Sequence, residues 1–268
     1  REIVLRLLDG DTAGTILFSE ADERASGFVC RLPVEIDSMT DIPKTARAVQ
    51  LTGPDELVLN SDKPVYEPGP RQVLFRVLCV GLCFSDLKLL KQFSKHVRKQ
   101  EVVSGIDPDI LAALASYVPG EKPAVPGHEP VIEILACGEG ADRFRPGERY
   151  FVQADWRWIK TPNSNGAFGY NFEGALQEYT LADERLLVSP DGESMLLPLA
   201  DPSKSWAAYG LVEAWACVEQ SYRAPQRRTL KSGGRMLVAA DGEITAAELR
   251  DLFDRFGRPG SLTWLSNR

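Results

Sequence analysis

Short apolar runs, separated at close intervals by glycine and proline, make up the first two-thirds of the chain. Runs rich in Val, Leu, Ile, Phe and Tyr between such breaks are typical of β-strands. Helical spacing, with apolar residues recurring at threes and fours, falls at 84–93 and 108–117. The pattern therefore predicts strands at 2–8, 15–19, 27–32, 45–50, 56–59, 72–80, 131–137, 149–152, 176–181 and 186–187.

Long connections separate several of these strands, at 81–127 and 155–174. Many short strands joined by long loops favour a small, partly open β-barrel whose loops carry the function.

The pattern changes near residue 197. Helical periodicity continues to residue 222, and a strand–helix–strand succession is then predicted at 235–239, 244–256 and 261–265. The helix has capping candidates at both ends, namely Thr245 or Asp241 at its start and Gly257 at its end. Such a unit begins a doubly wound nucleotide-binding domain, and alone it cannot cover both faces of a parallel sheet. We expect either further chain or docking onto the barrel, and we favour further chain.

Composition and charge narrow the class of partner. The chain has 268 residues, 44% of them apolar, so it can bury a large core. A net charge of -7 argues against a nucleic-acid or anionic-membrane partner and favours a small molecule. The longest strongly apolar stretch, 77–84, is far shorter than the roughly 20 residues of a membrane-spanning helix, and no signal peptide is recognisable. A cytoplasmic protein without a membrane partner is therefore expected.

Three residues stand out as candidates for metal chemistry. Cys83 follows a predicted strand, His128 follows a Pro-Gly turn and is next to Glu129, and Glu213 lies in an apolar helical stretch. Each also has a plainer interpretation: a small buried apolar residue, a core histidine, and a glutamate on a solvated face. Cys, His and Glu are ligands that Zn²⁺ accepts, and three of them with one open position define a catalytic zinc site.

Local motifs strengthen the metal hypothesis. The stretches GLCFSD at 81–86, PGHE at 126–129, GEG at 138–140, FRPGE at 144–148 and GALQEY at 174–179 occur in this order. In order and spacing the chain resembles the zinc-dependent alcohol and polyol dehydrogenases of the medium-chain dehydrogenase/reductase family. Three further stretches, at 89–96, 165–170 and 211–222, resemble the sorbose-1-phosphate reductase branch of that family.

The resemblance implies a mainly β fold with an α/β portion. Residues 1–44 would be an N-terminal β extension, 45–196 a GroES-like, partly open β-barrel catalytic domain, and 197–268 connecting helices with the start of an incomplete Rossmann domain.

The same resemblance implies an oxidoreductase that moves hydride between NAD or NADP and a polyol or sugar alcohol or ketone. Cys83 and His128 would bind the catalytic zinc, Glu129 and Glu213 would ligate the metal or its water, and Ser85 would relay the substrate proton. Family members with a structural zinc hold it in a four-cysteine lobe, and the corresponding stretch, 155–173, contains no cysteine. A single catalytic zinc is therefore predicted.

The cofactor region departs from the family. After the strand at 235–239, where a glycine-rich turn would approach a pyrophosphate, Gly242 lies between Asp241 and Glu243. Negative charge at this point opposes dinucleotide binding. Arg268 could suit a 2′-phosphate or could be a surface arginine. Binding of NAD or NADP is thus implied by the resemblance alone.

A basic cluster contrasts with the acidic composition of the chain: Lys88, Lys91, Lys95, His96, Arg98 and Lys99. It is either a solvated helical face or a clamp for the phosphate of a sugar phosphate, in which Lys95 and His96 would contact the substrate.

Two other functions remain open: a non-catalytic metal- or ligand-binding module descended from such a dehydrogenase, and a zinc-independent quinone-type reductase. The sequence is also compatible with a homo-oligomer.

Overall fold

The structure is a computed structural model, and it describes residues 4–6, 15–17, 27–30, 42–201, 203–223, 229–240 and 244–266. The chain divides into two compact units, Arg1–Leu211 and Val212–Arg268. Within the described residues, no helix is both long enough and apolar enough to cross a membrane.

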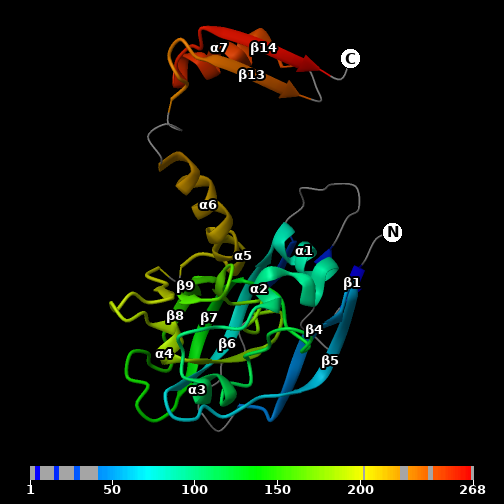
Figure 1. Ribbon diagram of the computed structural model, residues 1–268, viewed down its shortest axis with the longest axis vertical. Helices are drawn as coiled ribbons and strands as arrows, with labels where there is room; N and C mark the ends of the chain where they lie inside the picture. Colours follow the sequence, from blue (N-terminus) through cyan, green and yellow to red (C-terminus); the bar gives the residue numbers. More distant parts are fainter. Residues whose placement is uncertain are drawn as a thin grey trace. The chain divides into compact units, whose positions relative to one another are not determined.

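A six-stranded antiparallel sheet forms the centre of the first unit (Figure 1). Its longest strand, β6, pairs with β7 along one edge and is buried at every residue. The other edge of β6 is shared, because β11 pairs with its first half and β3, from the N-terminal region, pairs with 79–82. The strands are β3 (Gly27–Cys30), β6 (Gln72–Leu82), β7 (Glu129–Cys137), β8 (Arg149–Val152), β11 (Tyr179–Asp183) and β12 (Leu196–Pro198).

Smaller hairpins complete the β structure of this unit. They are β1 (Val4–Arg6) with β2 (Thr15–Leu17), β4 (Thr45–Gly53) with β5 (Glu56–Pro64), and β9 (Asp155–Lys160) with β10 (Asn165–Ala167). β4 is joined to the loops beside β7 and β11 by backbone hydrogen bonds from Leu51 to Ala124 and from Val49 to Leu176. The sheets described are open, which agrees with the mainly β, partly open architecture expected from the sequence.

Short helices connect the strands. They are α1 (Phe84–Gln92), the 3₁₀ turn η2 (Phe93–Lys95), α2 (Val97–Gln100), α3 (Pro108–Ala112), α4 (Glu184–Leu187) and α5 (Trp206–Gly210). The helix expected at 84–93 is confirmed, whereas the one expected at 108–117 ends at Ala112. The strand expected at 186–187 is wrong: the Asp183 side chain accepts a hydrogen bond from the Arg185 amide and starts α4 there.

Two apolar clusters hold the loops of the first unit against its sheets. The larger one contains Trp156, Phe168 and Phe172, in the region expected to be a long connection and found instead to contain β9 and β10. The smaller one joins β4, the helical region after β6 and the loop after β10, through Leu51, Leu89, Phe93, Ala167 and Tyr170. This second cluster joins β10 and the loop after it to α1 and to the turn that follows α1.

The second unit contains α6 (Val212–Arg223), β13 (Arg235–Ala240), α7 (Ala246–Phe256) and β14 (Ser261–Ser266). β13 and β14 are parallel, so the expected strand–helix–strand unit is confirmed (Figure 1). Thr245 and Glu248 form a reciprocal capping box at the start of α7, and Gly257 ends it with a positive φ of 90°. Asp241, Gly242, Glu243 and Arg268 lie outside the described residues.

Candidate metal centre

Cys83 lies where β6 ends and α1 begins, as the N-cap of that helix. Its sulfur accepts a hydrogen bond from the Ser85 amide at 3.3 Å, and its own amide donates to Asp86 Oδ2 at 3.1 Å. This is a capping box in which a thiol takes the place of the usual hydroxyl. The helix start therefore fixes the thiol and the Asp86 carboxylate together.

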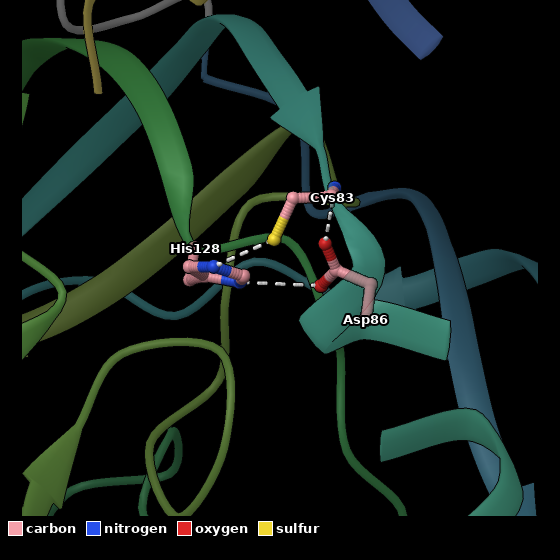
Figure 2. Close-up of side chains that lie close together, drawn as sticks. All are labelled: Cys83, Asp86 and His128. Carbon is pink, nitrogen blue, oxygen red and sulfur yellow. Dashed lines mark hydrogen bonds and ion pairs between the residues drawn. The ribbon is translucent and has the colours of Figure 1, made fainter. Parts of the chain in front are cut away.

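His128 faces both of these groups from the start of β7 (Figure 2). Its Nε2 is 3.4 Å from Cys83 Sγ, and its Nδ1 is 3.3 Å from Asp86 Oδ1, which also accepts from the Gly127 amide at 3.1 Å. A carboxylate on one ring nitrogen fixes the tautomer and leaves the other nitrogen for a metal. Asp86 thus directs His128 Nε2 towards the Cys83 sulfur.

The separation of the two atoms suits a single bound ion. With Zn–S near 2.3 Å and Zn–N near 2.0–2.1 Å, tetrahedral geometry places sulfur and nitrogen about 3.5 Å apart. The 3.4 Å between Cys83 Sγ and His128 Nε2 fits this requirement. The ligand atoms of Cys83, Asp86 and His128 all lie within 4.8 Å of one another.

Glu129 adds a carboxylate beside the same nitrogen. Its Oε1 is 3.7 Å from His128 Nε2, and the residue is buried. Gly81 on β6 lies opposite Glu129 and makes room for its carboxylate. A Cβ at position 81 would lie 2.7 Å from Glu129 Oε2 and 2.8 Å from the Gly210 carbonyl oxygen. Any larger residue at position 81 would displace this carboxylate.

Ser85 completes the group around the thiol, with its Oγ 3.2 Å from Cys83 Sγ. The structure therefore brings together Cys83, Ser85, His128 and Glu129, four residues selected from the sequence.

The electrostatics favour a positive group at this point. Burial alone would lower the pKa of His128, but its hydrogen bonds with Asp86 and Cys83 outweigh this and raise the pKa well above its ordinary value. In the absence of a metal, the raised pKa favours the positively charged imidazole, with a proton on both ring nitrogens. The same acceptors that hold this proton would hold a cation.

Sequence reasoning missed two residues of the cluster. Asp86 belongs to the GLCFSD motif, and its position three residues after the helix cap is the signal that could have identified it. Tyr170 lies far away in sequence, and its ring centroid is 5.5 Å from that of His128.

The remaining candidates belong to other elements of the chain. His96 stacks on Tyr170 at 5.0 Å, which puts it one ring away from His128, and Lys95 is exposed. Glu213 lies on α6 in the second unit, where Cys217 Sγ donates a hydrogen bond to its Oε1 at 3.1 Å. Gly242 and Arg268 are among the undescribed residues.

Residues 69–191, which contain Cys83, Asp86, His128 and Glu129, match the model of the alcohol dehydrogenase GroES-like domain. The resemblance to zinc-dependent medium-chain dehydrogenase/reductases is thereby confirmed, and the chain is similar to zinc-type alcohol dehydrogenase-like proteins.

Individual relatives agree with this family. The zinc-type alcohol dehydrogenase-like protein YphC of Escherichia coli K12 is 27% identical over 164 residues, covering 56% of this chain and 42% of that protein. An L-sorbose 1-phosphate reductase of Klebsiella pneumoniae is 27% identical over 183 residues, covering 68% and 38%. The chain thus spans about two-fifths of the length of these relatives.

The fold has a counterpart among solved structures. The NADH complex of the alcohol dehydrogenase rspB from E. coli CFT073 has a TM-score of 0.50 and 15% identity, covering 84% of this chain and 63% of that one.

Proposed function

We propose that this chain is the catalytic part of a zinc-dependent oxidoreductase that transfers hydride between NAD or NADP and an alcohol or ketone group of a polyol or sugar. The observation that carries the proposal is the Cys83–His128 pair, at zinc-ligand spacing and with Asp86 behind the imidazole. A chain that had lost the chemistry would have no need to keep this set together with Ser85 and Glu129.

Each residue has a task in this reaction. Cys83 and His128 would hold the ion, Glu129 would ligate it or its water, and Glu213 would supply a further carboxylate. Zinc in this position polarises a carbonyl or lowers the pKa of an alcohol. Ser85 Oγ, beside the ligand sulfur, would give a proton to the reacting oxygen or take one from it.

The cofactor is proposed from the relatives. NADH is bound in the rspB structure, whose fold this chain shares. β13, α7 and β14 would form the beginning of the dinucleotide-binding domain.

A sugar phosphate is the substrate class that the exposed members of the basic cluster favour; the buried Lys99 is not one of them, because its Nζ donates to the backbone carbonyls of Val118, Gly120 and Lys122. Burial, followed by repulsion from Arg98 and Lys88, lowers the pKa of His96, so this residue is a neutral hydrogen-bonding group at pH 7. Lys88 and Lys95 are exposed and would supply the charge, whereas Arg98 is already paired with Asp155. The K. pneumoniae relative is itself a reductase of a sugar phosphate.

Metal analysis tests the central claim. Purified protein is expected to contain one zinc per chain, and Cys83→Ala should lose it. Cys137→Ala is the matched control, since Cys137 is a partly buried thiol that donates to the Phe144 carbonyl. Zinc retained by Cys83→Ala would show that Cys83 does not hold the metal, and a folded protein that takes up no metal would exclude the zinc enzyme and favour a quinone-type reductase.

Turnover separates an enzyme from a binding module. The zinc-loaded protein should oxidise NADH or NADPH in the presence of a ketose phosphate, and Lys95→Ala should raise KM for that substrate without changing KM for the unphosphorylated sugar. Equal changes would argue against a phosphate site. NADH and NADPH can also be titrated against the tryptophan fluorescence of the protein. If the protein binds zinc but this fluorescence responds to neither nucleotide, a non-catalytic module is favoured.

A further inference from the structure

The N-terminal region is joined to the six-stranded sheet through β3. Among the described strands before residue 42, β3 alone pairs with a strand of that sheet, and it covers the second half of β6 up to Leu82. The residue after Leu82 is Cys83. Four residue pairs form this ladder, from Gly27 opposite Leu82 to Cys30 opposite Cys79. The N-terminal region is therefore attached beside the strand end that leads into the metal centre.

The last pair of this ladder consists of two cysteines, Cys30 and Cys79. Residues directly opposite each other in an antiparallel pair belong to the same face of the sheet, and their Cα atoms are about 4.5 or 5.5 Å apart, depending on the type of pair. A disulfide requires a Cα separation of about 4.4–6.8 Å. Both types of pair meet this requirement, so the register of β3 on β6 places Cys30 and Cys79 within reach of a disulfide.

The register also separates Cys79 from the other cysteines beside β6. Cys83 follows Cys79 by four residues. Cys137 pairs with Val73, six residues before Cys79. At about 3.3 Å per residue, these positions are about 13 and 20 Å from Cys79 along the strand, beyond the roughly 7 Å that a disulfide tolerates between Cα atoms. Strand pairing therefore selects Cys30 as the partner of Cys79.

The surroundings of Cys79 suit a disulfide. The residue is 2% exposed, it belongs to a small apolar cluster with Val131 and Tyr209, and its thiol donates to the Trp206 carbonyl at 3.2 Å. Helix α5, which contains Trp206 and Tyr209, contacts β3, β6 and β7. Oxidation would remove the thiol proton from the Trp206 carbonyl but would keep an apolar sulfur in the cluster. Because thiol exchange depends on access, a bond at this place would be reduced slowly.

We propose that Cys30 and Cys79 form a reversible disulfide that fastens the N-terminal region to β6. The bond forms by exchange with a small disulfide such as oxidised glutathione. One cysteine thiolate attacks the small disulfide and releases one thiol, and the other cysteine then attacks the mixed disulfide and releases the second thiol. The two cysteines lose two electrons and two protons, which leave with the two small thiols. In a reducing compartment both residues stay thiols, and the attachment depends on strand pairing and on the contact with α5.

Peptide mapping tests the bond directly. The purified full-length chain is equilibrated with oxidised glutathione at pH 8, alkylated and digested with trypsin. A linked pair of peptides, 25–31 with 77–88, is expected in the mass spectrum. Because 77–88 contains both Cys79 and Cys83, the variants assign the bond. The link should persist in Cys83→Ala and should be lost in both Cys79→Ala and Cys30→Ala.

Two controls make the mapping decisive. Cys137→Ala removes another thiol of the six-stranded sheet and should keep the link. Refolding from denaturant in the same glutathione buffer gives the buried Cys79 thiol full access to the oxidant. Absence of the linked pair from both the folded and the refolded protein would overturn the proposal, and so would a link that disappears in Cys83→Ala. The bond needs neither zinc nor turnover, so this result is separate from the test of the zinc enzyme.

Thermal unfolding tests whether the bond fits the native register. Cys30 and Cys79 would close a loop of about 50 residues, and such a crosslink stabilises a protein chiefly by restricting its unfolded chain. Oxidation should therefore raise the Tm of the wild-type protein by about 5–10 °C, and it should leave the Tm of Cys30→Ala unchanged. A linked protein whose Tm is unchanged or lower would contradict the proposal, because its bond would then distort the ladder instead of fastening it.

Discussion

The two units of the chain bury their elements to very different degrees. In the first unit every residue of β6 is buried, and the strand is paired on both edges. In the second unit α7 has no buried residue, and Leu237 and Leu265, on β13 and β14, are 61% and 54% exposed. A parallel pair of strands is stable when both its faces are covered.

This difference explains which functional residues can be assigned from geometry. Cys83, Asp86 and His128 have partners that fix each side chain from more than one direction. Glu213 lies on α6, in the unit that buries less, and its role as a ligand stays a prediction from sequence. Substitutions made in one unit at a time therefore test whether the difference in burial between the units determines stability and metal binding.

The largest contrast is expected from breaking one ion pair in each unit. Glu133 on β7 joins two arginines of neighbouring strands, Arg76 at 2.8 Å and Arg149 at 2.7 Å, and Arg76 is buried. Glu133→Ala should lower the free energy of unfolding by about 3–5 kcal/mol, because it removes the carboxylate that both arginines share at a largely buried position. Denaturant unfolding followed by circular dichroism measures this.

The matched change in the second unit is Glu219→Ala on α6. Glu219 and Arg223 are both exposed and lie 3.5 Å apart, so the loss should be below about 0.5 kcal/mol. If the two substitutions destabilise the protein equally, the contrast in burial does not determine stability.

The next largest effect concerns the carboxylate behind His128. Asp86→Asn keeps the size of the side chain but weakens its hold on the imidazole, so zinc affinity should fall about 10–100-fold. Competition with a chromogenic chelator measures the change, and Asp62→Asn on the exposed strand β5 is the control. Unchanged affinity in Asp86→Asn would mean that the Gly127–Asp86 contact has a purely structural purpose.

The sequence was most informative where local chemistry determines structure. Continuous apolar runs predicted β6 and β7. Gly257 predicted the end of α7, and of the two candidates for its start, Thr245 and Asp241, Thr245 is the cap. The prediction failed at 186–187, where two leucines look like a strand but Asp183 caps a helical turn. A single side-chain hydrogen bond decided between the two structures.

The candidate site was predictable in part for the same reason. Cys83 and His128 stand in motifs with recognisable neighbours, so they could be selected before their separation was known. Tyr170 ends the stretch 165–170, but nothing in that stretch indicates a place beside His128, which depends on Gly169 and Gly174 allowing two backbone segments to touch. Contacts of this kind are set by tertiary packing, which no local pattern records.

The pH dependence of metal binding tests the electrostatics of the first unit. Because hydrogen bonds to Asp86 and Cys83 raise the pKa of His128, zinc must displace a proton from the imidazole. Zinc affinity should therefore increase with pH, by up to about tenfold per pH unit for each proton released, and should still be rising above pH 7. An imidazole of ordinary pKa would release its proton near pH 6.5, and its contribution would then level off. Calorimetric titration at pH 8 in two buffers that differ in ionisation enthalpy counts the protons released: more than one if the imidazole also gives up a proton, and at most the one of the Cys83 thiol otherwise.

The smallest expected effect on metal binding decides whether the second unit takes part in the metal centre at all. If Glu213 supplies a carboxylate to the ion or to its water, Glu213→Gln should weaken zinc binding about tenfold, comparable to the loss of one outer ligand. Glu219→Gln, on the same helix and equally charged, is the control for a general change in electrostatic potential. A specific loss in Glu213→Gln assigns this residue to the centre, because the total charge of the two variants is identical. Identical affinities would instead show that Cys83, His128 and Glu129 hold the metal with residues of the first unit alone.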